Sequence, residues 1–446
     1  MQKIINLLIA FSLTIAGATA SSIDKTIFKS NINRSAVAVT VKDAETGKVL
    51  YDHNGKKPMI PASTLKAVTY ITALDELGSD YEFKTSLYKT TDNELILKLG
   101  ADPFLVGRDL KDLMQAAKDK NIYEPKAIKI DDFIIDQNEW GEGWQWDDDL
   151  NPLMPKFSAY NIDKNLLQVN IFPEAPGAPA DLRLTEFYPV TFTNMVTTGE
   201  YNNIKLSRNN SISPNILKLE GTVANKTEVI FPVNYPRRYF ILRLEEAIRA
   251  RKVGYYGNFA SVKTPNKNVY LISEITNPIS LATQAVMKDS NNMVAETVFK
   301  IAGGHYANTT GSAENGTEMF LNHCKDINVN TEDIRMVDGS GVSKNNLVTA
   351  DFMTNFLIAE NKANKDYIEI FAQPGEGTLK KRMLYLKGKL HAKTGTLADV
   401  SALTGFIKTL SGKTLAFDIM INDAKSTASD KKMLEEYIIR AIYSEY

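Results

Sequence analysis

The chain has 446 residues, 43% of them hydrophobic and 24% charged, which is the composition of a globular protein with a sizeable core. Its 52 basic and 53 acidic side chains nearly balance, so a general nucleic-acid-binding protein is excluded as the leading interpretation. A single cysteine, Cys324, rules out an intramolecular disulfide, and the 4 histidines lack the helical spacing of a zinc protease.

Residues 1–20 have the pattern of a secretory signal peptide. Lys3 supplies a positive charge, residues 4–16 are mostly apolar, and residues 18–20 read Ala-Thr-Ala, a small-residue cleavage site. The apolar stretch is short for a bilayer span, which disfavours the alternative of an uncleaved membrane anchor. We therefore expect a mature chain that begins at Ser21, is exported to the periplasm and has no transmembrane segment.

The next segment predicts a β-hairpin followed by a helix. Residues 36–43 alternate apolar and polar side chains, residues 44–47 have turn composition, and residues 48–52 return as a second strand. Apolar residues recur every three positions from Leu65 to Leu77, which predicts a helix that begins after Pro61 and ends at Gly78.

The residue pattern of 82–268 differs from that of the segments on either side. They contain many short strand-like runs, several Pro and Gly breaks and all 3 tryptophans. We predict an inserted, mostly β second domain, interrupted by a small third domain at about residues 155–235, because a Pro-rich stretch at 173–189 marks a sub-boundary. Residues 242–252 predict a short helix within it.

The remaining chain predicts two helices, three strands and a closing helix. Asn277 and Pro278 have the N-cap and first-turn composition of a helix, which breaks at 289–292 before a second helix runs to Gly303. Strands are predicted at 391–396, 402–408 and 414–421. The closing helix is expected to pack through one apolar face: Met433, Leu434, Tyr437, Ile438, Ala441 and Ile442.

Three short motifs carry chemistry. Ser63 and Lys66 lie one helical turn apart, so a desolvated lysine could accept the proton of a nucleophilic serine. Ser290 and Asn292 fall in the predicted break between two helices, where capping residues are also common. Lys393, Thr394, Gly395 and Thr396 lie on a predicted edge strand, and Gly395 leaves room for another backbone to approach.

The order of these motifs resembles that of the penicillin-recognising serine enzymes. The segments KDSNNMVAETVFKIAGGH around Ser290, DGSGVS (338–343), AKTGTL (392–397), GADPFL (100–105) and GWQWDDD (143–149) are similar to those of the low-molecular-mass class C penicillin-binding proteins of the DacB type. The resemblance covers essentially the whole mature chain.

The resemblance implies an α+β fold: a serine β-lactamase/transpeptidase-like domain, with an antiparallel sheet flanked by helices, formed by residues 21–81 and 269–446. It implies a serine-type D-Ala-D-Ala carboxypeptidase with DD-endopeptidase activity. The partners would be peptidoglycan stem peptides and cross-links, with β-lactams as covalent inhibitors of Ser63. It calls for no metal and no other cofactor, and it allows a homodimer.

The resemblance also implies a role for each motif residue. Ser63 would be the nucleophile, Lys66 its proton acceptor, and Ser290 the relay to the departing D-Ala nitrogen. Asn292 would bind the peptide amide and Lys66, and Lys393 would keep Lys66 neutral. Gly395 belongs to the substrate-binding strand, where Thr394 and Thr396 would help bind the substrate carboxylate. The backbone N–H groups of Ser63 and Thr396 would form the oxyanion hole.

Two positions depart from the family pattern and one matches it. Lys344 stands where an arginine commonly holds the far end of the stem peptide, and a lysine loses the bidentate fork. Ala398 stands where a glutamine is frequent. Asp148 matches an aspartate that would pair with the amino group of the diaminopimelate side chain.

Two other functions stay open. A β-lactamase would need a base for rapid deacylation, and the acidic residues 147–149 precede Ser290, whereas the acidic motif of class A β-lactamases follows the Ser-x-Asn motif. A non-catalytic penicillin-sensing or scaffold protein would have no need of a complete motif set.

Overall fold

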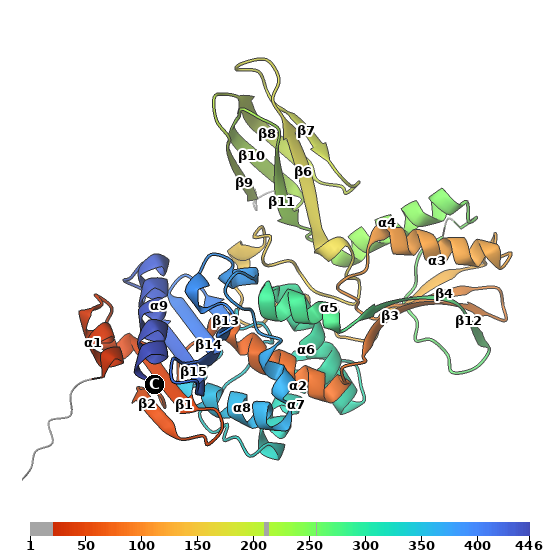
Figure 1. Ribbon diagram of the computed structural model, residues 1–446. Helices are drawn as coiled ribbons and strands as arrows, with labels where there is room; N and C mark the ends of the chain where they lie inside the picture. The colour runs from red at the N-terminus through yellow and green to blue at the C-terminus, as the bar shows by residue number, and fades with distance from the viewer. Residues whose placement is uncertain (1–20, 209–213, 256) are drawn as a thin grey trace, which may run out of the picture.

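The computed structural model describes residues 21–208, 214–255 and 257–446, so the predicted signal peptide lies outside the described residues. Its centre is a five-stranded antiparallel sheet that joins the N-terminal and C-terminal parts of the described chain (Figure 1). Its strands, in spatial order, are β13 (Leu390–Thr396), β14 (Val400–Lys408), β15 (Thr414–Asn422), β1 (Val37–Asp43) and β2 (Val49–His53). The predicted hairpin and the three predicted C-terminal strands are confirmed, and β13 is an edge strand.

Helices cover both faces of this sheet. Val37, Val39 and Val41 belong to the cluster formed with α1 (Ser22–Lys29) and α9 (Ala428–Glu445). Ala38 belongs to the opposite cluster, with α2 (Leu65–Leu77) and α8 (Ala350–Ala363), because successive strand residues point to opposite faces. Beside α2 lie α5 (Ser280–Ala282), the π-helix η5 (Thr283–Lys288), α6 (Asn292–Ala307) and α7 (Ala313–Asp326).

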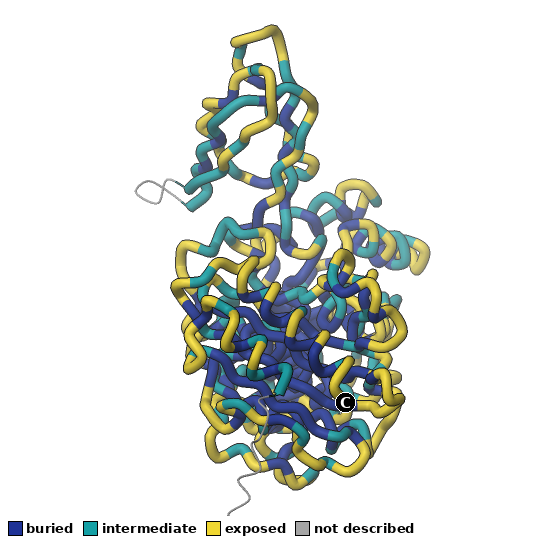
Figure 2. Tube along the Cα trace, turned by 60° about the vertical axis from the view of Figure 1, so that its left-hand side comes forward, coloured by how far each residue is buried: buried dark blue, intermediate teal, exposed yellow. Residues whose placement is uncertain are grey.

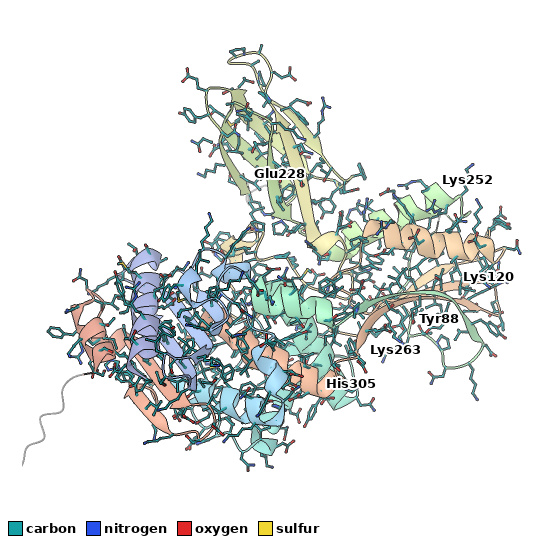
Figure 3. All side chains as sticks on the ribbon, viewed as in Figure 1. Tyr88, Lys120, Glu228, Lys252, Lys263 and His305 are labelled. Carbon is teal, nitrogen blue, oxygen red and sulfur yellow. The ribbon has the colours of Figure 1, made fainter. Side chains whose placement is uncertain are left out.

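A second sheet lies beside this body, with two helices over one face (Figure 1). Its strand order is β12 (Val269–Pro278), β3 (Glu82–Thr90), β4 (Leu95–Lys98) and β5 (Ile128–Asp131). The covering helices are α3 (Gly107–Asp119) and α4 (Pro236–Arg251), which end beside the exposed Lys120 and Lys252 (Figure 3). Cations at these ends stabilise the helix dipoles.

A small β module projects from the rest of the molecule (Figures 1 and 2). One of its sheets contains β11 (Thr227–Pro232), β6 (Leu166–Phe172) and β7 (Asp181–Leu184), and the other contains β8 (Thr191–Thr198), β10 (Ile216–Val223) and β9 (Asn203–Arg208). Alternate residues such as Val169, Ile171, Leu217 and Leu219 are buried between them. Seven 3-10 turns complete the described elements: η1 (Arg34–Ala36), η2 (Ala62–Thr64), η3 (Trp146–Asp148), η4 (Asp163–Asn165), η6 (Lys365–Ile368), η7 (Gly377–Leu379) and η8 (Leu384–Leu386).

The predicted helix start at Asn277 and Pro278 is wrong. Both residues lie in β12, where Asn277 pairs with Phe83 of β3, and helical structure begins only at Ser280. Because β12 is an edge strand, the missing N–H of Pro278 costs no hydrogen bond to a neighbouring strand. Because β12 pairs with β3, the chain leaves the second sheet after Pro278.

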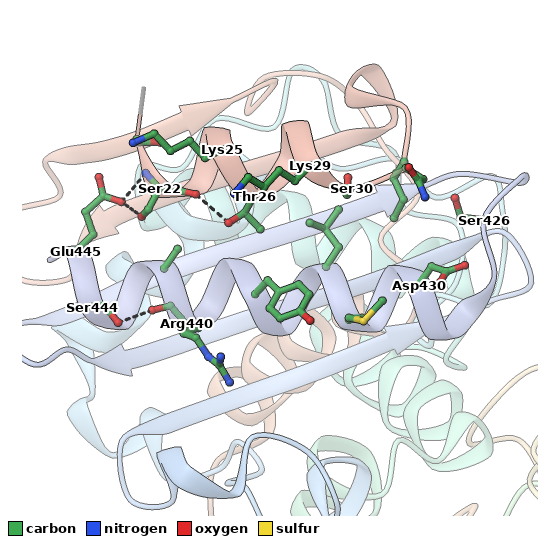
Figure 4. A pocket seen from close by; sticks show the side chains of 17 residues that line it. Ser22, Lys25, Thr26, Lys29, Ser30, Ser426, Asp430, Arg440, Ser444 and Glu445 are labelled. Atoms are coloured by element: carbon green, nitrogen blue, oxygen red, sulfur yellow. Dashed lines mark hydrogen bonds between the residues drawn. The ribbon is translucent and has the colours of Figure 1, made fainter. Parts of the chain in front are cut away.

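The helix content of residues 82–268 was underestimated. The strongly charged α3 was not predicted, and α4 begins at Pro236 at its first turn rather than at residue 242. The predicted packing face of α9 includes two residues that do not pack, since Met433 and Tyr437 are exposed. They line a groove of about 900 Å³ between α1 and α9, beside Arg440 and Lys25 (Figure 4).

No helix among the residues that the structure describes is long and apolar enough to cross a membrane.

Candidate active site

Ser63 and Lys66 are in direct contact at the start of α2. Lys66 Nζ lies 2.9 Å from Ser63 Oγ, and the lysine side chain is completely buried, whereas Ser63 is half-buried. Ser63 belongs to the 3-10 turn η2 and Lys66 to the first turn of α2, so one continuous helical segment sets their spacing. A buried amine at hydrogen-bond distance from a reachable hydroxyl is the arrangement that general-base activation of a serine requires.

The turn that carries Ser63 is fixed by close backbone contacts. Ala62 has a positive φ of 49°, a conformation that a non-glycine residue adopts only when its surroundings hold it there. β13 lies against this turn through Gly395, where a Cβ atom would stand 2.8 Å from the carbonyl oxygen of Pro61 and 3.0 Å from the nitrogen of Ser63. The absence of a side chain at position 395 therefore lets the edge strand meet the turn that carries Ser63.

Asn292 and Ser290 enter from the junction between η5 and α6. Asn292 Oδ1 accepts a hydrogen bond from Lys66 Nζ at 2.7 Å. Ser290 has a left-handed φ of 62°, and the neighbouring Asn291 caps α6 by accepting from the backbone N–H of Val294. Asn291 thus caps the helix, and its two neighbours, Ser290 and Asn292, contribute their side chains to the site.

Lys393 and Thr394 contribute the third side of the site from β13. Lys393 is completely buried and donates to Ser290 Oγ at 2.8 Å and to the carbonyl oxygen of Thr394 at 2.9 Å. The hydroxyl of Thr394 donates to Thr378 Oγ1 at 2.8 Å. The structure therefore joins five predicted residues by hydrogen bonds in two groups: Ser63 with Lys66 and Asn292, and Ser290 with Lys393.

Burial is the main reason that Lys66 can act as a base. Loss of solvent lowers its pKa to about 7, although the charges of Asp338 and Glu296 oppose this effect. Glu296, itself fully buried, has a pKa raised to about 7 by burial and by the charge of Asp338. At neutral pH, Lys66 therefore has a substantial neutral fraction.

The second lysine of the site has an even more perturbed amine. Burial lowers the pKa of Lys393 well below its usual range, and the charge of Lys66 lowers it further. Burial is thus the main cause for both lysines, and repulsion between the two amines adds to it at Lys393. Because two ammonium groups in one buried site repel each other, loss of a proton from either is favoured.

Several groups of the site could not have been identified from residue types. Lys66 Nζ also donates to the carbonyl oxygen of Ser340 at 2.6 Å. The side-chain amide of Asn292 donates to the carbonyl oxygen of Leu153 at 2.8 Å. Main-chain carbonyls carry no residue-type signal. Ser340 belongs to the DGSGVS segment, which the family resemblance had singled out.

The segment 143–149 reaches the site from the inserted region through Trp144. Its indole Nε1 donates to Asp338 Oδ2 at 2.8 Å, and both side chains are buried. Asp338 in turn accepts from the backbone N–H groups of Gly341 and Ser343. A chain of hydrogen bonds therefore links the inserted region to the loop that holds Lys66.

The remaining predicted residues, Asp148, Lys344 and Thr396, have no side-chain hydrogen bond to the motif residues among the described contacts and make other contacts. Asp148 is half-buried, and burial followed by the charge of Asp147 raises its pKa. Lys344 forms an exposed ion pair with Asp399 at 3.0 Å. Thr396 is exposed at the end of β13 and pairs with Ser401 of β14.

Comparisons with known proteins give one consistent result. Residues 19–440 match the profile of the D-Ala-D-Ala carboxypeptidase 3 (S13) family. The chain is 24% identical over 435 residues to the D-alanyl-D-alanine carboxypeptidase DacB of Haemophilus influenzae, covering 92% of this chain and 91% of that relative. It is 27% identical over 418 residues to the D-alanyl-D-alanine carboxypeptidase of an Actinomadura species, covering 86% and 77%.

Solved structures show the same fold. The crystal structure of penicillin-binding protein 4 (dacB) from Haemophilus influenzae is similar with a TM-score of 0.82 and 22% identity, covering 95% of this chain and 99% of that one. A second structure of that protein, in complex with a β-lactam, is similar with a TM-score of 0.77 at the same identity and coverage.

Proposed function

This chain belongs to the D-Ala-D-Ala carboxypeptidase 3 (S13) family, and we propose that it cleaves D-Ala-D-Ala stem peptides of peptidoglycan and their cross-links through an acyl-enzyme on Ser63. The observation that carries this proposal is the contact between Ser63 Oγ and the buried amine of Lys66 at 2.9 Å. The same acyl-enzyme chemistry makes β-lactams covalent inhibitors, because their ring carbonyl is attacked in place of the peptide carbonyl.

The proposed acylation step uses the two hydrogen-bonded groups in turn. Neutral Lys66 accepts the proton of Ser63 as its Oγ attacks the carbonyl carbon of the penultimate D-Ala. The C–N bond then breaks, and Ser290, hydrogen-bonded to Lys393, passes a proton to the departing amine. Water hydrolyses the resulting ester and restores Ser63.

Three further roles complete the proposed mechanism. The backbone N–H groups of Ser63 and Thr396 would bind the developing oxyanion, and one such donor typically contributes about 2.7–4 kcal/mol. Lys393 and Thr394 would hold the terminal carboxylate of the substrate. Asn292 would orient Lys66 and bind the peptide amide; its 2.7 Å contact with Lys66 Nζ supports the first part of that role.

The test is covalent labelling. The mature protein is incubated with a fluorescent penicillin, and the adduct is followed by intact mass and peptide mapping. We expect a long-lived adduct on Ser63, its absence in Ser63→Ala, and loss of D-Ala release from a muropeptide in the same variant. An adduct lost within seconds would instead support the β-lactamase, and muropeptide cleavage retained in Ser63→Ala would overturn the mechanism.

We propose that Asp148 recognises the diaminopimelate amine of the stem peptide. Its half-buried carboxylate and the adjacent contact of Trp144 with the Lys66 loop support this role. Asp148→Asn should raise KM for stems with a free amine roughly tenfold and leave penicillin acylation unchanged. Asp147→Asn, at an exposed neighbour, is the matched control, and equal losses on both substrates in Asp148→Asn would remove the proposal.

We propose that Lys344 binds a carboxylate at the far end of the stem. Its ion pair with Asp399 supports this, because a substrate carboxylate can replace a partner that is itself exposed. Lys344→Ala should then weaken peptide binding, whereas Asp399→Asn should free the lysine and strengthen it.

The proposed organisation of the molecule follows the same family. Residues 21–81 and the C-terminal segment would form the catalytic unit, and the segment between them would be an insert that includes β12. The export signal at 1–20 would place the enzyme in the periplasm beside its substrate. A homodimer is the further proposal, supported by the exposed Met433 and Tyr437 in the α1–α9 groove, and light scattering of the purified protein tests it.

A further inference from the structure

A second group of titratable side chains lies where three helices meet, at the end of α2 opposite to Ser63. Asp75 comes from the last turn of α2, His323 from α7 and Glu360 from α8. One ligand atom of each residue lies within 4.8 Å of those of the other two. None of the three makes a contact with the motif residues described above, so the catalytic mechanism does not account for this group.

The position of each side chain is fixed by its neighbours. Tyr367 donates a hydrogen bond to Asp75 Oδ1, which leaves Oδ2 facing His323 Nε2 at 3.5 Å. His323 Nε2 lies 2.5 Å from Glu360 Oε1, and its ring stands 6.2 Å from that of Phe356. Outer contacts of this kind orient ligand groups in metal sites.

The second oxygen of Glu360 is an unsatisfied buried group. The Glu360 side chain is 1% exposed, and its Oε2 has no hydrogen-bond partner among the described residues. Asp75 Oδ2 and Glu360 Oε1 both approach the same nitrogen of His323, so the two carboxylates converge on one point. A buried carboxylate oxygen without a donor carries a desolvation cost, and a cation between the two carboxylates would remove both that cost and their repulsion.

We propose that Asp75, His323 and Glu360 bind a divalent transition-metal ion, for which Zn²⁺ has the fitting ligand preference. One imidazole nitrogen and two carboxylate oxygens are a set that Zn²⁺ accepts at three protein positions, with a fourth position for water. The two carboxylate charges match the charge of the ion, and Asp75, with a side chain 35% exposed, leaves a path for entry. The bound ion would tie α2, α7 and α8 together, and it would stabilise the packing of these helices without taking part in acylation, because its ligands have no hydrogen bond or ion pair with the motif residues in the described part of the chain.

The competing explanation is a protonated histidine between two carboxylates. The hydrogen bond to Glu360 and the charges of Glu360 and Asp75 raise the pKa of His323, more than offsetting the opposite effect of burial. A proton satisfies the same negative charges without a metal. The two explanations differ in whether a stoichiometric ion binds.

Calorimetric titration of the mature protein with zinc sulfate, after removal of metal by a chelator and dialysis, separates them. We expect one equivalent to bind with a Kd of about 10 µM or tighter, and the Tm to rise on binding. Co²⁺ in place of Zn²⁺ gives a visible absorption band that reports ligand geometry directly. Penicillin labelling of Ser63 should be the same with and without metal.

His323→Gln and Asp75→Asn should each abolish this binding, and the exposed position of Asp75 makes its variant the safer one for folding. The matched control is His305→Gln, which removes an exposed histidine that pairs with Glu76 at 2.5 Å and should leave the titration unchanged. No saturable binding, or binding that persists in both His323→Gln and Asp75→Asn, would overturn the proposal and favour the protonated histidine.

Discussion

The proposed proton acceptor of this site is a lysine amine that is sealed from solvent. Lys66 is completely buried, yet it contacts three oxygens, those of Ser63, Asn292 and Ser340. A charged amine can donate to all three at once, whereas a neutral one has a lone pair free to accept the Ser63 proton. The pKa of about 7 places the change between these states in the neutral range.

The acylation rate should therefore rise with pH. Below about pH 7 most Lys66 amines are protonated, so the rate constant for reaction with a fluorescent penicillin should increase about tenfold per pH unit and level off above that value. Stopped-flow labelling across this range measures it, with intrinsic fluorescence as the control for folding. A rate independent of pH in folded protein would show that Lys66 is not the proton acceptor.

Asp418, another fully buried ionisable group, lies outside the motifs and bears on stability. Asp418 of β15 lies opposite Thr40 and Thr404, and neither of its carboxylate oxygens has a hydrogen-bond partner among the described residues. Burial raises its pKa well above the ordinary value. The native state therefore keeps a proton that the unfolded chain releases near pH ~3.9. The contribution of Asp418 to the free energy of unfolding is full below that pH and is lost as the pH rises toward the higher pKa of the native state.

Asp418→Asn should raise the free energy of unfolding at neutral pH by about 1–3 kcal/mol, because a neutral amide replaces an acid that is costly to ionise. The gain should shrink toward low pH, where Asp418 is protonated in both states. Urea unfolding at neutral and acidic pH measures both effects. Asp52→Asn is the control, since Thr40 already donates to that carboxylate, and an Asp418→Asn chain less stable at neutral pH would contradict the prediction.

At the scale of elements, the site depends on how closely β13 approaches the turn before α2. A Cβ atom at position 395 would stand 2.8 Å from the Pro61 carbonyl oxygen, which is closer than Cβ atoms in proteins approach a backbone oxygen. Since the obstructing atoms belong to the backbone, a side chain at this position must move either the strand or the nucleophile turn. The strand and the turn can therefore lie this close together only because position 395 has no side chain.

Gly395→Ala should lower penicillin acylation by roughly tenfold or more while the protein stays folded, because small displacements of reacting groups are costly. Labelling rates and thermal unfolding are measured on the same samples. Gly199→Ala in the small β module is the control, since its Cβ would meet Thr222 Cβ at 3.0 Å far from the motif residues. Equal effects of the two substitutions would show that packing alone is responsible.

Sequence patterns predicted local elements better than contacts between distant ones. Strand alternation in β1 and apolar spacing in α2 depend on neighbours in sequence, so both were predicted. The error at Pro278 arose because a helix start and the end of an edge strand tolerate proline equally well. The motif residues of the site were recognisable, but Thr378 and the Ser340 carbonyl oxygen were not, since only folding brings them to Thr394 and Lys66.

At the scale of the whole molecule, the inserted region takes part in holding the active site. Trp144 and Asp338 are 194 positions apart in the chain and meet in a buried hydrogen bond. The loop that follows Asp338 supplies the Ser340 carbonyl oxygen to Lys66. A change at Trp144 should therefore alter the surroundings of Ser63, although the two residues are 81 positions apart in the chain.

Trp144→Phe removes the indole donor and keeps an aromatic ring. We expect a loss of about 1–2 kcal/mol in stability and a several-fold lower acylation rate, because Asp338 loses one of its donors. Trp146→Phe is the matched control, since that side chain is 73% exposed and two residues away. Thermal unfolding and penicillin labelling of both variants test the link, and an acylation rate equal to that of the parent in folded Trp144→Phe would contradict it.

The pairing of β1 with β15 has a consequence for the order in which the protein matures. The central sheet cannot close until the last strands are available, because Val37 is paired with Ile421 across almost the entire chain. Pairings of such high sequence separation form late and slowly. Lys393 arrives with the same late segment, so a chain still emerging from the ribosome cannot yet bring this lysine to Ser290. The group of motif residues is therefore completed only when nearly the whole polypeptide has been delivered.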